Sequence, residues 1–300
     1  MDLNLLVQRG SEKLDKANVI KKINTAFQLG YDVVALNVEI GANELGAKNK
    51  IPEPPQYSLN QPELKVTTPR NRRLRILTRL TAVLTDSIES HRLFQSPVAK
   101  KYDILAISVT QEKMFQHLCN QGEFDIVCLP LDDRLPFVVK RTQYGAAKGR
   151  GLFFEIQYAP CIRDETSLRN TIANSQTLVH AGKGKGVIIS SGAWMPRELR
   201  GPYDAANLGL VYGLTECTAH EAVFRNCRNV IMHAETRRKA DRAIIFSKAV
   251  DELSAKDKWL VEVCKVPGTE GAAAKASTSA ESKSDGPPPK KKKRKGLGSL

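Results

Sequence analysis

Short apolar or β-branched segments recur along this chain, and stretches in which apolar residues have helical spacing separate them. Eight segments have the length and composition of β-strands: 3–7, 32–38, 74–84, 103–109, 125–129, 152–157, 187–191 and 229–233. Strands that alternate with helices in this way are typical of βα units around a parallel sheet. The pattern therefore predicts an α/β fold.

The segments between the strands carry stop signals for helices. Ile20 and Phe27 fall on one helical face, and Gly30 can adopt the left-handed conformation that ends a helix. Similar stripes predict one helix that stops at Gly122 and another over about 164–182. Eight strands with helices between them fit a closed, TIM-barrel-like structure. An open doubly wound sheet explains the alternation equally well, but no Gly-rich phosphate-binding turn follows the first strand.

Two segments break the alternation. Residues 41–73 hold five prolines with weak periodicity, which predicts an extended surface insertion. Residues 268–300 are rich in Ala, Ser, Lys, Gly and Pro, so apolar burial cannot offset the entropy cost of ordering them. We expect one α/β domain over residues 1–267, which contains the insertion, followed by a disordered basic tail.

The charge of the chain favours a polyanionic partner. Its 300 residues carry a formal net charge of +14. Residues 268–300 contain eight Lys or Arg residues and three acids, a net charge of +5, which leaves +9 on residues 1–267. A positive potential raises the local concentration of phosphates, so the predicted domain is itself suited to a nucleic acid.

Cysteine spacing and apolar run lengths indicate a reducing compartment, cytosol or nucleus. The six cysteines never lie within four residues of one another, which excludes a Cys-x-x-Cys redox motif or a zinc knuckle. The start of the sequence shows no basic region before an apolar run, and no segment has the roughly 18 apolar residues of a membrane span.

Basic residues gather in groups that could bind phosphates. Guanidinium groups match phosphate oxygens bidentately and position a protein without reading bases. One group, which includes Arg79, surrounds the start of the third predicted strand. The candidate RNA contacts are Arg70, Arg72, Arg73, Arg75, Lys140, Arg141, Lys148, Arg150, Lys183, Lys185, Arg197, Arg200, Arg237, Arg238 and Lys239. Taken singly, each could be a solvated surface charge, and the groups could equally cover an acidic protein partner.

Lys183 and Lys185 lie in the glycine-rich segment 182–186. A phosphate-binding loop follows a strand and precedes a helix, whereas this segment follows a predicted helix and precedes a strand. We interpret it as a helix terminator with two exposed lysines, which can still contact RNA.

A run of six cations follows three prolines in the basic tail. No acidic residue interrupts the run, which favours recognition by an import receptor over a merely solubilising role. The predicted nuclear-targeting residues are Lys290, Lys291, Lys292, Lys293, Arg294 and Lys295.

The most distinctive segment is 200–216, which reads Arg-Gly-Pro-Tyr-Asp-Ala-Ala-Asn-Leu-Gly-Leu-Val-Tyr-Gly-Leu-Thr-Glu. Together with 76–86, 102–106, 111–115 and 151–158, it resembles the TIM-barrel-like protein subunit of nuclear ribonuclease P and ribonuclease MRP. These segments occur in the expected order, and the resemblance covers about residues 1–250. It adds most of the support for a barrel.

The resemblance implies a non-catalytic, RNA-binding subunit of a ribonucleoprotein. The catalytic RNA would remove 5′ leaders from precursor tRNA with Mg²⁺ held by the RNA, and this chain would bind no cofactor of its own. The implied partners are that RNA, precursor tRNA as substrate, and other protein subunits, among them a small ferredoxin-like α+β subunit. The resemblance also implies a role in rRNA processing and a location in the nucleus and nucleolus. It implies no membrane partner.

The signature segment can also be read physically. Gly201 permits a bend and Pro202 fixes the start of a helix near Tyr203, which would present Arg197 and Arg200 at a loop rim. The helix face formed by residues 206, 210 and 214 is expected to be core or a subunit contact. Residues 218 and 221 have the spacing of a capping box for a following helix.

The alternative function is a metal-dependent phosphoesterase, because active sites of barrels lie at the C-terminal ends of strands. The start of the chain resembles the polymerase-and-histidinol-phosphatase type, whose first strand carries a His-x-His metal-ligand pair. This chain has Asn4 and Leu6 there, and its five histidines are well separated. Polar residues near predicted strand ends are Asp2, Asn4, Asn37, Glu39, Asp86, Ser108, Asp132, Asp133, Glu155, Ser190 and His233. A supporting role is favoured over this alternative.

Overall fold

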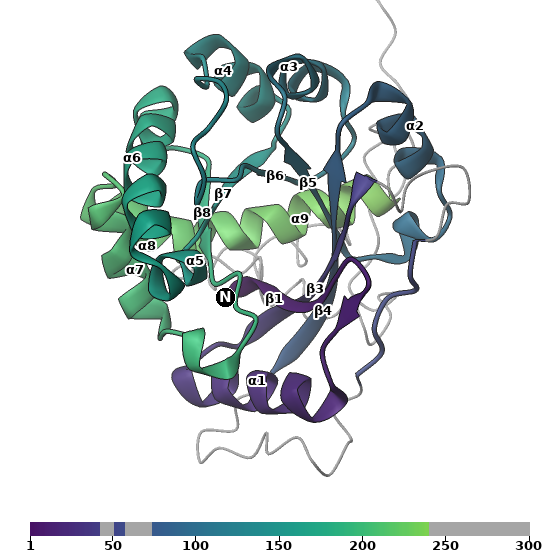
Figure 1. Cartoon of the computed structure of the whole chain (residues 1–300), viewed down its shortest axis with the longest axis vertical. Helices are drawn as coiled ribbons and strands as arrows, with labels where there is room; N and C mark the ends of the chain where they lie inside the picture. The colour runs from purple at the N-terminus through teal and green to yellow at the C-terminus, as the bar shows by residue number, and fades with distance from the viewer. Residues whose placement is uncertain (43–50, 58–73, 240–300) are drawn as a thin grey trace, which may run out of the picture. The chain divides into compact units, whose positions relative to one another are not determined.

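The computed structural model describes residues 1–42, 51–57 and 74–239, whose strands form one curled sheet (Figure 1). The sheet order is β2-β1-β3-β4-β5-β6-β7-β8. All neighbouring strands are parallel except β2, which pairs antiparallel with the end of β1. The strands are β1 (Asp2–Arg9), β2 (Glu12–Lys13), β3 (Val33–Ile40), β4 (Arg75–Leu84), β5 (Ile104–Val109), β6 (Ile126–Cys128), β7 (Phe153–Gln157) and β8 (Val187–Ser190).

The two ends of the sheet meet where β1 approaches the segment after β8. Leu5 and Ala193 form a parallel bridge, and the amide of Leu6 donates to the carbonyl oxygen of Ala193 at 3.2 Å. Lys22 donates to a carbonyl oxygen on each side of this seam, that of Leu6 at 2.5 Å and that of Ala193 at 3.0 Å. Burial lowers the pKa of Lys22 to about 8. The sheet is therefore TIM-barrel-like, as the strand–helix alternation and the family resemblance together predict.

Helices cover the outside of the sheet (Figure 1). They are α1 (Lys16–Leu29), α2 (Ser87–Gln95), α3 (Glu112–Gln121), α4 (Arg141–Gly149), α5 (Ala159–Arg163), α6 (Glu165–Gly182), α7 (Pro202–Val211), α8 (Glu216–Val223) and α9 (Arg225–Lys239), with 3-10 turns η2 (Ala99–Lys101) and η3 (Pro196–Glu198). Helix α9 crosses the sheet at the N-terminal ends of its strands. Arg237 and Arg238 of α9 bind Asp125 and Asp103, which directly precede β6 and β5.

Several predicted helix ends are confirmed. Gly30 ends α1 with a φ of 107°, and its amide donates to the last turn of the helix. Asp164 caps α6, where its side chain accepts from the amide of Ser167. Lys183, at a φ of 52°, ends the same helix, and Gly184 and Gly186 also have positive φ before β8 begins. Segment 182–186 is thus a helix terminator, as interpreted from its order in the chain.

Two local predictions are wrong. The predicted strand over 229–233 is part of α9. Its apolar residues Val230 and Ile231, with Ala234, form the buried side of that helix, so a short apolar run mimicked a strand. The capping box of α8 begins at Thr215, whose side chain accepts from the amide of Thr218, rather than at Thr218 itself. The curled sheet therefore has seven parallel strands, and β2 rather than 229–233 is the eighth strand of the described residues.

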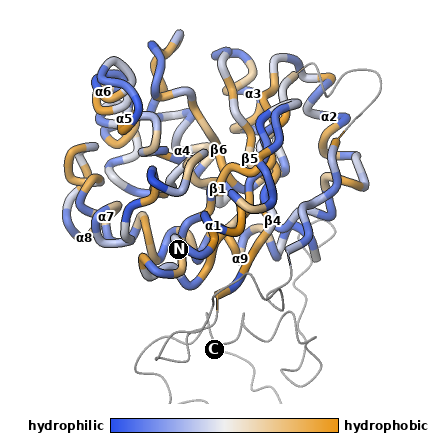
Figure 2. Tube along the Cα trace, turned by 60° about the horizontal axis from the view of Figure 1, so that its bottom comes forward, coloured by the Kyte–Doolittle hydropathy of each residue, from blue (hydrophilic) through white to orange (hydrophobic). Residues whose placement is uncertain are grey.

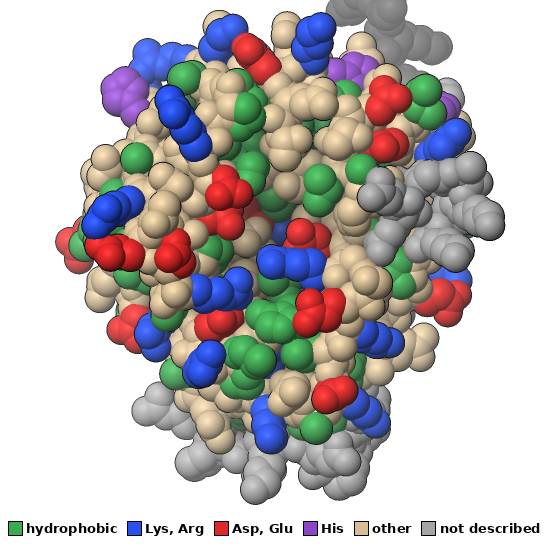
Figure 3. Space-filling view, in the orientation of Figure 1, with side chains coloured by type: hydrophobic (Ala, Val, Ile, Leu, Met, Phe, Trp, Pro, Cys, Tyr) green, Lys and Arg blue, Asp and Glu red, His purple; other side chains and the backbone are tan. Residues whose placement is uncertain are grey.

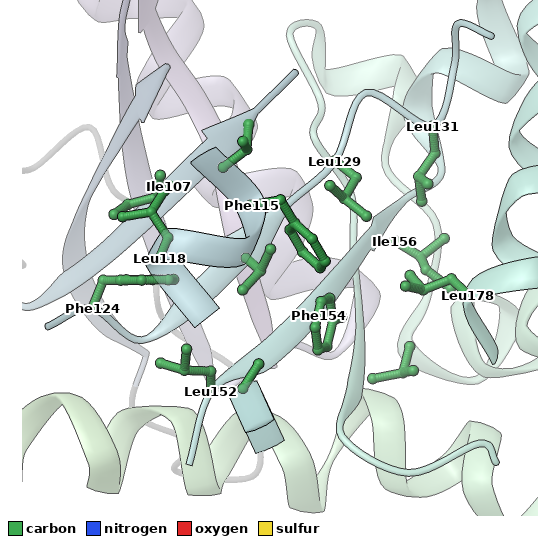
Figure 4. Close-up of a cluster of buried hydrophobic side chains, with 14 of the residues drawn as sticks. Ile107, Phe115, Leu118, Phe124, Leu129, Leu131, Leu152, Phe154, Ile156 and Leu178 are labelled. Atoms are coloured by element: carbon green, nitrogen blue, oxygen red, sulfur yellow. The ribbon is translucent and has the colours of Figure 1, made fainter. Parts of the chain in front are cut away.

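The core lies in the layer between the sheet and its helices. Figure 4 shows part of the larger cluster, in which Phe115 of α3 packs beside Phe154 of β7 with ring centroids 6.2 Å apart. A second cluster fills the space between α1 and the strands β1 and β3, around Ile23 and Phe27. The hydropathy of the residues matches this location of the core: the strands are largely hydrophobic, and the helices that cover them carry both hydrophobic and hydrophilic residues (Figure 2).

Much of the predicted insertion and tail lies outside the described residues. Within 41–73 the structure describes 41–42 and 51–57, where the carbonyl oxygen of Pro52 accepts from the hydroxyl of Tyr102 at 2.9 Å. The predicted domain boundary at residue 267 and the tail 268–300 stay predictions. None of the helices over the described residues is long and apolar enough to cross a membrane.

Candidate nucleic-acid interface and barrel interior

The interior of the barrel holds a buried ion pair. Arg79 of β4 and Glu155 of β7 are both fully buried, and two nitrogens of the guanidinium donate to the two carboxylate oxygens at 2.5 and 2.6 Å. Arg79 also donates to the carbonyl oxygen of Leu3 at 2.9 Å and to the hydroxyl of Thr81 at 3.1 Å. The notion of Arg79 as an RNA contact is therefore wrong, because the side chain points inward from a strand that is covered on its outer face.

Side chains from the other strands complete this interior network. Ser190 donates to Glu155 at 2.7 Å, and the thiol of Cys128 donates to it at 3.1 Å. Asn4 donates to Glu155 at 3.3 Å and accepts from Asn37 at 2.7 Å. We call these residues, with Thr81 and the ion pair, the luminal cluster: Asn4, Asn37, Arg79, Thr81, Cys128, Glu155 and Ser190.

The electrostatics of the luminal cluster keep Glu155 ionised. Burial by itself raises the pKa of Glu155, but the charge of Arg79 and the hydrogen bonds from Arg79 and Ser190 hold this pKa below its ordinary value. Burial opposes the charge of Arg79, yet Glu155 raises the pKa of the guanidinium. A carboxylate whose oxygens already accept from a guanidinium, a hydroxyl and a thiol has no free lone pair with which to serve as a base.

The luminal cluster does not fit the metal site of a phosphoesterase. Asn4, at the position of the first expected histidine, is hydrogen-bonded to two side chains, and Leu6 is buried and apolar. Over residues 1–42, 51–57 and 74–239 there is no group of three or more His, Cys, Asp or Glu side chains that could hold a metal ion. Of the polar residues predicted at strand ends, Asn4, Asn37, Glu155 and Ser190 do converge.

The other predicted strand-end residues are dispersed. Glu39 pairs with Arg9 near the molecular surface at 3.3 Å, and Asp86 caps α2. Asp132 and Asp133 lie in the loop after β6, where their carbonyl oxygens accept from residues of α6. The remaining ones are Asp2 at the start of β1, where burial raises its carboxyl pKa, Ser108 in β5, and His233 in α9.

At least four of the predicted RNA contacts have partners within the protein. Arg150 donates to the carbonyl oxygens of Leu118 at 3.2 Å, Cys119 at 3.3 Å and Gly122, which end α3. Lys140 pairs with Glu112 at 2.8 Å, although both are largely exposed. The other two are Arg237 and Arg238, which anchor α9 to Asp125 and Asp103. Arg150, Arg237 and Arg238 thus have structural roles that leave less of their charge for RNA.

Three other lysines gather beside one another at the N-terminal ends of β7 and β8. Lys148, Lys183 and Lys185 are exposed. The hydroxyl of Tyr144 on α4 donates to the carbonyl oxygen of Lys185 at 2.6 Å, which fixes the 182–186 turn against α4. A Cβ placed on Gly186 would lie 3.7 Å from the side chain of Lys148. These residues form what we call the lysine group.

The remaining candidates lie elsewhere. Arg141 at the start of α4 is exposed, as are Arg197 in η3 and Arg200 before α7. The backbone of Arg200 is fixed, because its carbonyl oxygen accepts from the hydroxyl of Tyr31 and its amide donates to the hydroxyl of Tyr158. Arg75 begins β4. Arg70, Arg72, Arg73, the side chain of Lys239 and the run 290–295 lie outside the described residues.

On the face shown in Figure 3, Lys and Arg side chains are interleaved with Asp and Glu. In the lysine group, the contact of Tyr144 with Lys185 and the nearness of Gly186 to Lys148 bring together exposed predicted cations from two separate segments. Sequence reasoning identified its members but could not tell them from Arg79 or Arg150, whose partners are distant in sequence.

Residues 1–239 match the family model described as "RNase P subunit p30". Ribonuclease P protein subunit p30 of Mus musculus is 41% identical over 250 residues, which cover 83% of this chain and 92% of that protein. The probable ribonuclease P protein subunit 3 of Schizosaccharomyces pombe is 35% identical over 228 residues, 76% of this chain and 91% of that protein. Ribonuclease P/MRP protein subunit RPP1 of Saccharomyces cerevisiae is 24% identical over 231 residues, 77% of each.

The fold is shared with a solved ribonucleoprotein component. A chain from the cryo-EM structure of archaeal ribonuclease P with mature tRNA superposes with a TM-score of 0.55 at 13% identity. The match covers 81% of this chain and 97% of that chain, so the barrel described above corresponds to nearly the whole archaeal chain.

Proposed function

This chain belongs to the RNase P subunit p30 family, and we propose that it is a non-catalytic, RNA-binding protein subunit of ribonuclease P and of ribonuclease MRP. The observation that carries the proposal is the family match over residues 1–239, which spans the whole described barrel. The particle would remove 5′ leaders from precursor tRNA and act in rRNA processing. Relatives named as subunits of ribonuclease P, and one of ribonuclease P/MRP, support this role.

The luminal cluster supports a non-catalytic role. At the interior position where a barrel enzyme could hold reacting groups, Glu155 is ionised, buried and already hydrogen-bonded by Arg79 and Ser190. The cleavage chemistry is assigned to the RNA of the particle, with Mg²⁺ bound by that RNA. The alternative, a metal-dependent phosphoesterase, lacks support from the side chains that occupy this interior.

The mechanism of the subunit is positional. Cations on its surface reduce the repulsion between RNA phosphates and fix the register of the protein on the RNA without reading bases. The lysine group is the best supported contact, because Lys148, Lys183 and Lys185 are exposed and adjacent. Arg141, Arg197 and Arg200 are further exposed candidates.

The partners in this proposal are the ribonuclease P and MRP RNAs, precursor tRNA and other protein subunits, including a small ferredoxin-like α+β subunit. The protein would act in the nucleus and nucleolus, and the run from Lys290 to Lys295 would direct its import. Removal of that run should leave a tagged chain largely cytoplasmic in imaging, whereas continued nuclear accumulation would assign import to another segment or to a partner.

The assembly itself provides the test. Material isolated from nuclear extract on a tagged copy of the chain should contain RNA and remove the 5′ leader from precursor tRNA. The matched control is an unrelated tagged nuclear protein taken through the same isolation. Material that contains the chain and RNA but leaves precursor tRNA uncut would contradict the proposed function.

A further inference from the structure

Three aromatic rings meet on the outer side of α7 and α8. Tyr203 near the start of α7 is 66% exposed, and its ring centroid lies 5.8 Å from that of His220 on α8 and 5.8 Å from that of Phe224 just after α8. His220 and Phe224 are stacked at 5.7 Å with planes 15° apart. Figure 1 shows the two helices side by side on the outside of the barrel, next to β8.

The apolar surface extends along α7 beyond the rings. Leu210 is 48% exposed and Val211 is 47% exposed. Tyr203 and Leu210 are seven residues apart, so they lie on the same side of the helix. The sequence left open whether position 210 was core or a subunit contact, and its exposure removes it from the core. Large exposed apolar residues that share one side of a helix mark interaction surfaces more often than isolated ones do.

The charge of this surface differs from that of the rest of the chain. Residues 202–224 contain no Lys or Arg, although the chain has 46 such residues among 300. The same stretch contains three acids, Asp204, Glu216 and Glu221; Glu221 is paired with Arg225 at 3.1 Å, so Asp204 and Glu216 give this face its negative charge. A negative surface repels RNA phosphates and attracts a surface that carries lysine or arginine.

The surface is also held rigidly. A Cβ on Gly209 of α7 would lie only 2.9 Å from Ala219 Cβ on α8 and 2.9 Å from Ile189 Cδ1 on β8, so the two helices and the sheet are in close contact there. The cap formed by Thr215 fixes the start of α8. Because the rings already restrict one another, a partner would lose little affinity to the ordering of this face.

We propose that the α7–α8 face, defined by Tyr203, Leu210, Val211, His220 and Phe224, is a docking site for a second protein. That protein presents apolar side chains flanked by lysine or arginine. Rigid, exposed aromatic side chains are the residues that most often carry binding energy at protein interfaces. The inference rests on the proposed function only in that the partner is a component of the same particle.

Site-specific cross-linking identifies the occupant. A photoreactive benzoylphenylalanine replaces Tyr203 in the tagged full-length chain, and a control chain carries it at Val138, which is 68% exposed but lies beside Lys140. After irradiation of the purified assembly and digestion of its RNA, mass spectrometry identifies what is attached. Position 203 should yield a peptide of another protein that contains Lys or Arg beside apolar residues. Cross-links from position 203 to nucleotides overturn the proposal. A yield of protein cross-links no higher than that at position 138 also overturns it.

A pair of exposed substitutions measures the contribution of the face. Tyr203→Ser with Leu210→Ser should weaken retention of the cross-linked protein at least about tenfold, while Val138→Ser leaves it unchanged. Circular dichroism of the isolated chains checks that the fold is retained. Equal retention in both variants contradicts the docking site. Loss of precursor-tRNA cleavage from the unsubstituted assembly would instead count against the proposed function, so the two failures are distinguishable.

Discussion

Replacement of Arg79 by methionine tests whether the barrel interior is held together by the luminal cluster. Methionine fills much of the same volume but removes both hydrogen bonds to Glu155 and those to Leu3 and Thr81. The carboxylate of Glu155 would then be buried without a counter-ion. Breaking a buried pair in this way costs about 3–5 kcal/mol, a large part of the stability of a typical domain.

A second substitution separates the buried charge from the lost packing. In Arg79→Met with Glu155→Gln, the side chain at position 155 is neutral and its oxygen can still accept from Ser190. The double variant should recover roughly 2 kcal/mol relative to Arg79→Met alone, because the uncompensated charge is the main penalty. Glu155→Gln alone leaves Arg79 without its carboxylate partner and should also be less stable than the unsubstituted chain.

The pH dependence gives an independent signature. In the unsubstituted protein the pKa of Glu155 is lowered, so its contribution to stability is present above the ordinary carboxyl pKa and lost as pH falls through the lowered value. Without Arg79, burial raises that pKa, and the stability of the variant is lost as pH rises through the raised value. The difference between the two proteins should therefore be largest at neutral pH and shrink in acid.

Urea denaturation followed by far-UV circular dichroism, at neutral and acidic pH, measures all four proteins. Surface substitutions usually change the free energy of unfolding by no more than about 0.5 kcal/mol. If Arg79→Met lowers the free energy of unfolding by no more than this, the buried pair does not hold the interior together. Reduced RNA affinity in that variant without reduced stability would place Arg79 on the surface. Strict additivity of the two substitutions would show that the residues are not coupled.

Further predictions concern the surface cations and the seam. Alanine at the lysine group, residues 148, 183 and 185, should reduce the log–log salt slope of RNA binding by roughly 0.7–0.9 for each phosphate that is no longer neutralised, while alanine at exposed lysines 13, 16 and 21 leaves the slope unchanged. Arg150→Ala should lower the free energy of unfolding by about 1–3 kcal/mol, because the carbonyl oxygens at the end of α3 lose their donor. The salt slope of RNA binding should change little. A reduced slope with unchanged stability would make Arg150 an RNA contact. Burial lowers the pKa of Lys22 to about 8, so the charged form of Lys22 costs stability below that pH. Between pH 8 and 10.5 the free energy of unfolding of the unsubstituted chain should rise by roughly 3 kcal/mol relative to that of Lys22→Met, measured by denaturation. Parallel plots of unfolding free energy against pH for the two proteins would contradict the buried amine.

The sequence was sufficient for the order of strands and helices because their periodicities differ, and caps such as Gly30 and Asp164 act locally. The choice of a barrel over an open sheet depended mostly on the family resemblance. Segment 229–233 shows where this information ends. A run of five residues cannot distinguish a strand from the buried side of a helix, and only its packing against the sheet ends decides.

Side-chain partners were less predictable, since they depend on contacts between distant parts of the chain. Arg79 and Glu155 are 76 positions apart, and the carbonyl oxygens that accept from Arg150 lie 28 to 32 positions before it. A signal for Arg79 did exist, because an arginine in the middle of the apolar segment 74–84 is costly unless a buried acid compensates it. The cations that remain exposed in the lysine group were recognised, but as members of a larger set.

We propose that the barrel supports an RNA that performs the chemistry. Cleavage of precursor tRNA by material isolated on this chain, assayed before and after digestion of the RNA in that material, tests this proposal. Leader removal should disappear with the RNA and should not return when RNA-free chain is supplied with divalent metal. Leader removal by the RNA-free protein would refute the supporting role and make the barrel itself the enzyme.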